Sequence, residues 1–301
     1  MPEHTPLVSI VLCSYNGEKF LSQQIDSLLA QTYPNFEVII SDDRSTDSTP
    51  EIIKGYAAKD PRIRLHLNPV NLGYNENFEQ AFRLAQGQLI AVCDQDDVWR
   101  KDKVEIMVPL FVNEHTLLAH CKSVRFTTEL PTACRYTKRN AFDGNTLAKL
   151  MLFNTVAGHN IIFKRPLLDH IPSFPPGVFY DWWLVIIAAI HGEVRSVDDI
   201  LTYHRSHDSN LTLGKKDEKK QTRSKYLERV CTVEAMQRVD RISTDERKLA
   251  RKLVKKLHAL DKKRFSFSLF VFLALHASTF FFFKKNFFSR IKMAYRMSFA
   301  I

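Results

Sequence analysis

The sequence predicts an α/β protein in which a mostly parallel β-sheet is flanked by helices and followed by a basic and apolar helical tail. In the first hundred residues, short apolar runs alternate four times with segments of helical spacing. The composition, 45% hydrophobic and 25% charged among 301 residues, is that of a globular chain with a packed core. Residues 1–214 carry 20 Lys and Arg against 25 Asp and Glu, whereas residues 215–301 carry 23 against 8. The basic character therefore belongs to the tail.

Each strand predicted in the first hundred residues is a short apolar run rich in β-branched side chains. Residues 8–13 read Val-Ser-Ile-Val-Leu-Cys, which is typical of a strand covered on both faces. Apolar residues then recur at helical spacing until Tyr-Pro-Asn at 33–35 breaks the pattern. Ser48 and Glu51 match a capping box, which predicts the start of the second helix. The expected strands are 8–13, 36–40, 63–67 and 89–93, and the expected helices are 21–31, 48–59 and 75–85.

From residue 103 to residue 207 the pattern is looser. The composition changes after Leu213, which divides the chain into an α/β domain at 1–213 and a basic helical tail at 214–301. The expected helices before this boundary are 103–113, 144–153 and 181–191, and the expected strands are 118–124, 159–163 and 193–197.

Acidic residues directly follow two of the predicted strands. Asp42 and Asp43 follow the second strand, and Asp-Gln-Asp-Asp at 94–97 follows the fourth. Because ligands of parallel sheets bind beyond the carboxyl ends of the strands, we expect both clusters to meet in one crevice. Neighbouring carboxylates repel one another unless a cation joins them, and Mg²⁺ or Mn²⁺ prefers such oxygen ligands. The alternative is a solvated acidic turn that caps the next helix.

Residues 8–49, VSIVLCSYNGEKFLSQQIDSLLAQTYPNFEVIISDDRSTDST, together with the tetrad at 94–97, closely resemble the family-2 glycosyltransferases. The catalytic domain of that family has the Rossmann-like, nucleotide-sugar-binding fold called GT-A. The resemblance covers roughly residues 5–210. It implies an inverting, metal-dependent transferase of the hexosyltransferase class, with Mn²⁺ or Mg²⁺ as its cofactor.

The resemblance also implies which residues hold the donor. Asp42 would read the nucleotide base, for which a carboxylate suits the ring N–H of a pyrimidine. Asp96, in the Asp-x-Asp pattern begun by Asp94, would hold the metal together with His207. For Ser14 and Asn16 the alternative is a turn or a helix cap. The implied nucleotide contacts are Ser14, Tyr15, Asn16, Asp42, Asp43, Asp94 and Gln95.

Asp181, in Tyr-Asp-Trp-Trp at 180–183, resembles the residue that supplies the family's catalytic base. It would remove the proton of the acceptor hydroxyl as the oxygen attacks the anomeric carbon. The alternative is that Asp181 caps a helix and that the two tryptophans belong to the core. The further implied contacts to diphosphate or acceptor are Asp97, Arg205, His159, Trp182 and Trp183, with His204 second to His207 as a metal ligand.

Residues 265–283 of the tail form an aromatic-rich run without Asp, Glu, Lys or Arg, close to the ~20 residues that span a bilayer. Lys and Arg flank the run at 262–264 and 284–285. Three arrangements stay open: a segment on or re-entering the membrane surface, a true span, or a helix packed on the catalytic domain. The basic flanks fit an anionic membrane surface.

Other classes of protein fit the sequence less well. A nucleotidyltransferase or a dehydrogenase would need a glycine-rich phosphate loop after the first strand, and Ser-Tyr-Asn-Gly at 14–17 does not supply one. A non-enzymatic protein that binds a membrane or nucleic acid through the basic tail is the main alternative, although the acidic body would repel nucleic acid. No secretory leader is expected at 1–12, and the five scattered cysteines, without a CxxC pair, suggest reduced thiols. These cysteines are Cys13, Cys93, Cys121, Cys134 and Cys231.

We therefore expect a cytoplasmic enzyme, peripheral or embedded at the inner face of the cell membrane. It would move a sugar from a nucleoside diphosphate donor to a glycan or a lipid-linked oligosaccharide, in the assembly of a bacterial lipopolysaccharide O-antigen or capsule. The forms of the segments at 93–97 and 181–183 look most like those of rhamnosyltransferases, so the expected donor is dTDP-rhamnose, with UDP-sugars next. No nucleic acid partner is expected.

Overall fold

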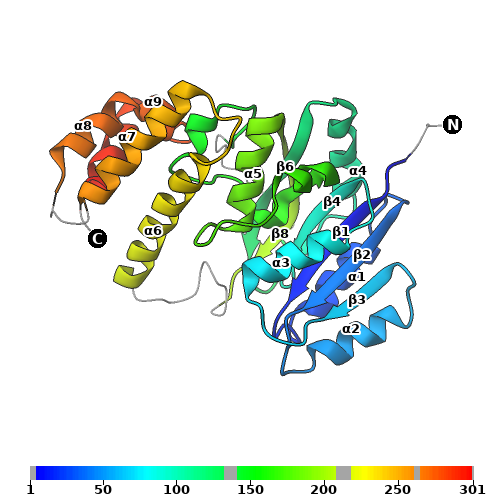
Figure 1. The fold of residues 1–301 in the computed structure, drawn as a ribbon. Coiled ribbons are helices and arrows are strands. Elements are labelled where there is room, and N and C mark those ends of the chain that lie inside the picture. The colour runs from blue at the N-terminus through cyan, green and yellow to red at the C-terminus, as the bar shows by residue number, and fades with distance from the viewer. Residues whose placement is uncertain (1–4, 132–140, 208–217, 261–264, 300–301) are drawn as a thin grey trace.

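The computed structural model describes residues 5–131, 141–207, 218–260 and 265–299 (Figure 1). The predicted boundary at Leu213, Cys134 and the basic flank at 262–264 lie outside these residues. The described cysteines are all free thiols, in agreement with the sequence prediction.

Eight strands of the described residues form one sheet in the order β3-β2-β1-β4-β7-β6-β8-β5 (Figure 1). β1 pairs in parallel with β2 on one side and with β4 on the other, so the carboxyl ends of all three lie at one edge. β7 is antiparallel to β4 and β6, whereas β8 is parallel to β6. The strands are β1 (Val8–Ser14), β2 (Phe36–Asp42), β3 (Ile63–Leu67), β4 (Leu89–Asp94), β5 (Val98–Trp99), β6 (Thr116–Phe126), β7 (Ile161–Lys164) and β8 (Glu193–Arg205).

Helices cover both faces of this sheet. α3 and α5 pack on one face together with Val11 and Ile39, and α1, α2 and α4 pack on the other with Ile10 and Ile40. Alternate side chains of one strand thus enter different cores, which explains the continuous apolar runs and confirms the predicted fold class. The helices are α1 (Leu21–Leu29), α2 (Thr49–Ala57), α3 (Tyr74–Leu84), α4 (Lys103–Met107), α5 (Tyr180–His191), α6 (Glu218–Met236), α7 (Thr244–Leu260), α8 (Phe267–Leu275), α9 (Ala277–Phe280) and α10 (Phe287–Met297).

The predicted elements differ from the structure mainly where a turn or a tertiary pairing intervenes. The Ser48 side chain makes no cap hydrogen bond; Asp47 instead accepts from the Thr49 N–H, at 3.0 Å, at the start of α2. The helix predicted at 103–113 is α-helical only over α4, up to Met107. A 3₁₀ helix, Val108–Val112, follows it, because the proline at position 109 has no N–H to continue the α-helix. The helix predicted at 144–153 is only a 3₁₀ turn at Leu147–Leu150.

The tail packs against the rest of the molecule instead of forming one long apolar helix. The predicted segment at 265–283 divides at His276 into α8 and α9, and Leu269, Leu273, Phe280 and Phe281 are fully buried. Among the described residues, no helix is long and apolar enough to cross a bilayer. The tail joins the same core as α3 and α5.

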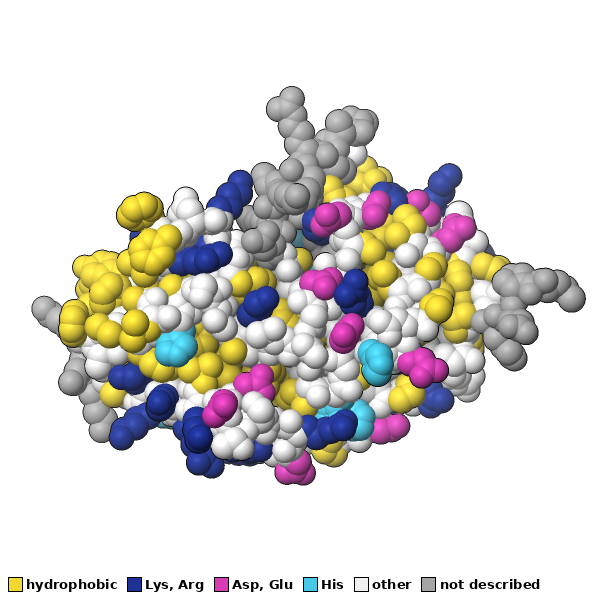
Figure 2. Space-filling view, turned by 90° about the horizontal axis from the view of Figure 1, so that it is seen from above, with side chains coloured by type: hydrophobic (Ala, Val, Ile, Leu, Met, Phe, Trp, Pro, Cys, Tyr) yellow, Lys and Arg dark blue, Asp and Glu magenta, His cyan; other side chains and the backbone are white. Residues whose placement is uncertain are grey.

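One set of tail side chains is apolar and exposed, and we call it the apolar face. Phe267 is 69% exposed, Leu275 76%, Phe287 65% and Phe288 82%. Figure 2 shows hydrophobic side chains gathering at the end of the molecule that the tail forms, with Lys and Arg close by. These side chains are large, apolar and open to solvent, unlike the buried apolar residues of the same tail.

Candidate active site

A cavity of about 2130 Å³ lies at the carboxyl ends of β1, β2 and β4. Its walls are the loops that follow these strands, the segment at 153–160, the end of β8 and one face of α6. Sites for one small ligand are commonly about 300–1,000 Å³. The volume therefore has room for two substrates. The predicted residues that line it are Ser14, Tyr15, Asn16, Asp43, Asp94, Gln95, Asp96, His159, Asp181, His204 and His207.

The loops after β1, β2 and β4 are tied together by polar side chains. Asn16 takes a left-handed backbone conformation (φ 48°), donates its N–H to Ser45 Oγ at 2.8 Å, and accepts from the Thr46 N–H at 2.8 Å. Gln95 accepts from the Tyr15 N–H at 2.9 Å, and its Nε2 donates to the Tyr15 carbonyl at 3.1 Å. The predicted nucleotide contacts therefore form one braced rim at the edge of the sheet.

Of the two adjacent carboxylates after β2, only one faces the cavity. Asp42 is buried and accepts from the hydroxyls of Ser14 and Ser45 at 2.9 and 2.6 Å. Asp43 lines the cavity and accepts from the two backbone N–H groups at 72–73, at 2.7 and 2.8 Å. Asp43 is therefore the member of the pair that lines the cavity, whereas Asp42 holds the loops beneath it, and the reading of the base by Asp42 stays a prediction.

Asp96 and His207 bring a carboxylate and an imidazole together in the cavity. Asp96 Oδ2 lies 2.7 Å from His207 Nε2, and Asp94 lies two residues earlier on the same wall. Burial raises the pKa of Asp96, and Asp94 and Asp97 raise it further against the opposing effect of His207. Crowded carboxylates beside an imidazole are a donor set that suits Mn²⁺ or Mg²⁺. The residues present thus fit a divalent cation.

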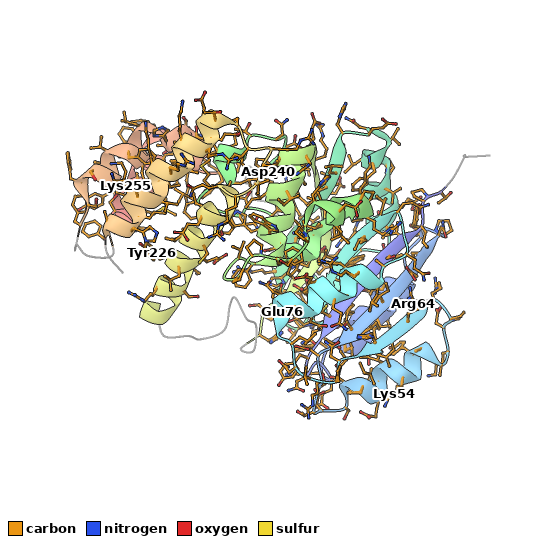
Figure 3. All side chains as sticks on the ribbon, viewed as in Figure 1. Lys54, Arg64, Glu76, Tyr226, Asp240 and Lys255 are labelled. Carbon is orange, nitrogen blue, oxygen red and sulfur yellow. The ribbon has the colours of Figure 1, made fainter. Side chains whose placement is uncertain are left out.

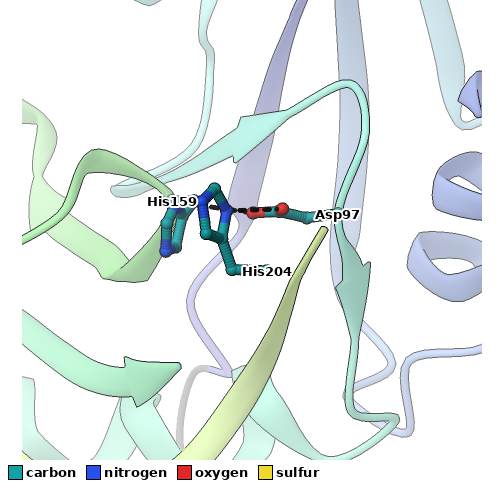
Figure 4. A group of neighbouring side chains, drawn as sticks. All are labelled: Asp97, His159 and His204. Carbon is teal, nitrogen blue, oxygen red and sulfur yellow. Dashed lines mark hydrogen bonds and ion pairs between the residues drawn. The ribbon is translucent and has the colours of Figure 1, made fainter. Parts of the chain in front are cut away.

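Asp97, His159 and His204 form a neighbouring cluster (Figure 4). Asp97 Oδ1 lies 2.9 Å from His204 Nδ1, and Asp97 Oδ2 lies 3.4 Å from His159 Nδ1. Burial would raise the pKa of Asp97, but the two histidines outweigh it and hold the pKa low. The three donor atoms lie within 4.8 Å of one another, a combination that also suits a cation. Asp97 is fully buried and does not line the cavity, and its predicted contact with diphosphate or acceptor stays a prediction.

A fully buried lysine, Lys103, packs against this cluster. Lys103 Nζ donates to the His159 carbonyl at 2.7 Å and to Thr202 Oγ1 at 3.0 Å, and it lies 3.5 Å from the centre of the Trp99 ring. Burial lowers its pKa, although the buried acids nearby oppose the shift. The lysine therefore fixes the position of His159 and offsets part of the negative charge around it.

Arg205 is a structural residue in this arrangement. Its guanidinium lies between the rings of Phe20 and Phe126, at 4.6 and 4.4 Å, and donates to the Asp96 carbonyl at 2.9 Å. The side chain is buried and does not line the cavity. These partners already use the guanidinium, and the predicted contact with the diphosphate stays a prediction.

Asp181, in the first turn of α5, lines the cavity. It is half-buried, and its Oδ1 accepts from the Trp182 N–H at 2.6 Å. Burial raises the pKa of Asp181 to about 6; Asp94 adds to the rise, while the Trp182 N–H and His159 oppose it. The carboxylate is largely ionised at neutral pH and still basic enough to take a proton.

The two tryptophans beside Asp181 belong to the core. Trp182 and Trp183 are 3% and 6% exposed, neither lines the cavity, and Trp182 Nε1 donates to the Leu150 carbonyl at 2.9 Å. α5 is apolar on all sides and buried, which explains why its tryptophans do not form an acceptor platform.

Some cavity residues gave no signal in the sequence. Ser224, Lys225 and Glu228 reach the cavity from α6, and Lys284 reaches it from the turn after α9. In the sequence they are ordinary members of a polar helix and a basic flank. The sequence did not indicate the role of Lys103 either, because a lysine at the start of a helix is normally expected to be exposed to solvent.

The comparisons with known proteins point to one family. A model of Glycosyl transferase family 2 matches residues 9–171. An uncharacterized protein of Mycobacterium tuberculosis is 29% identical over 220 residues, which are 66% of this chain and 59% of the relative. The E. coli protein UDP-Glc:alpha-D-GlcNAc-diphosphoundecaprenol beta-1,3-glucosyltransferase WfgD is 37% identical over 109 residues, 36% of this chain and 42% of its own. The chain thus spans less than two thirds of the length of these relatives.

Solved structures share the fold. S. aureus TarS 1-349 in complex with UDP-GlcNAc has a TM-score of 0.61 at 15% identity, covering 97% of this chain and 88% of its own. The mannosyltransferase PcManGT of Pyrobaculum calidifontis, in complex with GDP-Man and Mn²⁺, has a TM-score of 0.56 at 18% identity, covering 98% and 86%. The sheet with its C-terminal helices is therefore of the GT-A type. Because the family model matches more than half of its residues, the chain belongs to glycosyl transferase family 2.

Proposed function

We propose that the protein transfers a sugar from a nucleoside diphosphate donor to a hydroxyl of a growing glycan, with inversion at the anomeric carbon. One observation carries the proposal: a single cavity joins Asp96 and His207, which suit a cation and a diphosphate, to Asp181, which suits a general base. A transferase must hold the donor and the acceptor in one cavity so that their reacting atoms can meet.

The donor nucleotide would lie on the rim after β1, β2 and β4. Asp43 is the better candidate for the base, since it faces the cavity and a carboxylate has about four acceptor positions, more than its hydrogen bonds there use. Tyr15, 49% exposed, offers a flat ring beside it. The ligands named with the similar structures are UDP, UDP-GlcNAc and GDP-Man, so we rank UDP-sugars ahead of dTDP-rhamnose.

Asp96 and His207, with Asp94 beside them, would hold a divalent cation. When bound, such a cation neutralises charge on the departing diphosphate. Asp181 would accept the proton of the acceptor hydroxyl as that oxygen bonds to the anomeric carbon. The bond from this carbon to the diphosphate oxygen breaks in the same step, and its electron pair leaves with the nucleoside diphosphate.

The acceptor would be a lipid-linked oligosaccharide of a bacterial surface polysaccharide. The names of two relatives support this class: WfgD, and a putative teichuronic acid biosynthesis glycosyltransferase, TuaG, of Bacillus subtilis, 39% identical over 105 residues. The apolar face of the tail, with lysines at 284 and 285, supports peripheral binding to an anionic membrane at its cytoplasmic side.

Calorimetric titration of UDP, dTDP and GDP into the full chain, with and without Mn²⁺, tests the donor site. We expect one nucleotide to bind in a metal-dependent manner. Asp96→Ala should abolish this binding, whereas Asp245→Ala, at a tail carboxylate that is 95% exposed, should leave it unchanged. Absence of binding by all three nucleotides to the wild-type chain would contradict the proposed function.

A further inference from the structure

The first tail helix forms one wall of the cavity. Ser224, Lys225 and Glu228 stand at helical spacing on one face of α6, and all three line the cavity together with Asp181. This helix follows the region that the family model matches, residues 9–171. α6 thus shares the cavity with Asp181, the proposed base that acts on the acceptor, and its charged side chains reach the same space.

α6 is held firmly against that site. Arg229 Nε donates to the Leu152 carbonyl at 3.1 Å, and its guanidinium lies 4.8 Å from the centre of the Phe153 ring. The segment that begins at Phe153 continues as the cavity wall up to residue 160. Tyr226, labelled in Figure 3, donates from α6 to the Leu257 carbonyl of α7 at 2.7 Å. The position of residue 228 is thus fixed from both sides.

Glu228 is chemically unusual on this wall. It is half-buried, and within the part of the chain that the structure describes nothing donates a hydrogen bond to its carboxyl group. Burial raises the pKa of Glu228 to about 7, and the Asp181 carboxylate adds to the rise, while Arg229 and Lys225 oppose it. A carboxyl of this kind, in the same cavity as a second carboxyl that acts on it electrostatically, is available to bind a hydroxylated ligand.

We propose that Glu228 is an acceptor-binding residue, which holds a hydroxyl of the acceptor sugar beside the hydroxyl that Asp181 deprotonates. The inference rests on the proposed function and adds the tail to the acceptor site. Near neutral pH one carboxyl of the pair can donate a hydrogen bond while the other accepts, which matches the donor and acceptor character of neighbouring sugar hydroxyls. The tail then selects the acceptor as well as positioning the enzyme.

The test uses the full chain with Mn²⁺, UDP-sugars, and alkyl-diphosphate-linked GlcNAc, glucose, galactose, mannose and rhamnose as acceptor probes. With a probe that the wild type glycosylates, Glu228→Ala should raise the acceptor KM about tenfold, since a hydrogen bond in a half-buried site is lost. kcat and hydrolysis of the donor by water should change less than about twofold. The acceptor KM of Glu228→Gln should lie between those of the wild type and Glu228→Ala, because the amide can still form a hydrogen bond with a hydroxyl.

Glu234→Ala is the matched control, since Glu234 lies on the same helix, pairs with His258 and does not line the cavity. An unchanged acceptor KM in Glu228→Ala would overturn this inference but would leave the proposed function intact. A loss of donor hydrolysis in both Glu228 variants would also overturn it, because the residue would then be structural. A wild type that glycosylates no probe would count against the proposed acceptor class, and the inference would fall with it.

Discussion

At the scale of single residues, environment separates carboxylates that look alike in the sequence. Asp42 and Asp97 are buried and serve as hydrogen-bond acceptors within the protein. Asp96 lies against His207, and Asp181 lines the same cavity with its pKa raised to about 6 by burial. Asp181 thus combines exposure to the cavity with a basicity suited to proton transfer at neutral pH.

Asp181→Asn should keep donor binding and lose transfer. The amide cannot take a proton, so kcat should fall by about 10²- to 10⁴-fold, while the Kd of the nucleotide stays within about twofold. Calorimetry and initial rates measure the two effects separately. Asp169→Asn, at an exposed carboxylate, is the control. Near-normal turnover of Asp181→Asn would assign the base to another residue.

The pH profile should follow the ionisation of Asp181. Its pKa of about 6 lies above the ordinary value, so the protonated, inactive form accumulates below pH 6. We expect kcat/KM, measured at saturating metal, to be level near neutrality and to fall about tenfold per pH unit below the pKa. A limb near pH 4 instead would mean that the base is an exposed carboxylate.

At the scale of elements, close contacts position the site. Gly158 opens the 3₁₀ turn of Gly158–Asn160, and a Cβ there would overlap the Tyr180 hydroxyl and lie 3.4 Å from Asp181 Cβ. The turn that carries His159 can therefore pack against the start of α5 only because position 158 lacks a side chain. This contact couples the cluster around Asp97 to the proposed base.

Gly158→Ala should damage both stability and turnover. Overpacking at this contact should lower the free energy of unfolding by about 1–3 kcal/mol and reduce kcat by displacing Asp181. Urea unfolding and initial rates measure these effects. Gly55→Ala is the matched control: it lies in α2 with nothing within 4 Å of an added Cβ, and it should stabilise the protein by about 0.5–1 kcal/mol. Equal stability and turnover of the two variants would show that the residues around position 158 accommodate the added methyl group without cost.

At the scale of the whole molecule, the tail has two sides. Leu269, Leu273, Phe280 and Phe281 enter the same core as α5, while the apolar face points outward. Deleting the tail from position 262 would therefore expose a core as well as remove a membrane contact. Substitution of the exposed side chains is the sharper experiment.

Phe287→Ser together with Phe288→Ser should weaken binding to vesicles that contain anionic lipid by about tenfold or more, since two exposed aromatic side chains no longer enter the membrane interface. Flotation with the full chain at low salt measures the effect, and higher salt should weaken wild-type binding. Val112→Ser, at a position that is 85% exposed outside the tail, is the control. A wild type that stays soluble with such vesicles would contradict peripheral membrane binding.

The sequence by itself determined the parallel half of the sheet and the positions of the polar strand ends. Strands covered on both faces are apolar runs, so β1, β2, β3 and β4 could be predicted from the sequence. Parallel pairing then brings their carboxyl ends to one edge of the sheet. The tertiary structure alone decided which carboxylates face the cavity, that Trp182 and Arg205 are structural, and that Glu228 joins the site. Burial and side-chain direction depend on packing between segments far apart in the chain, and local residue patterns carry no record of that packing.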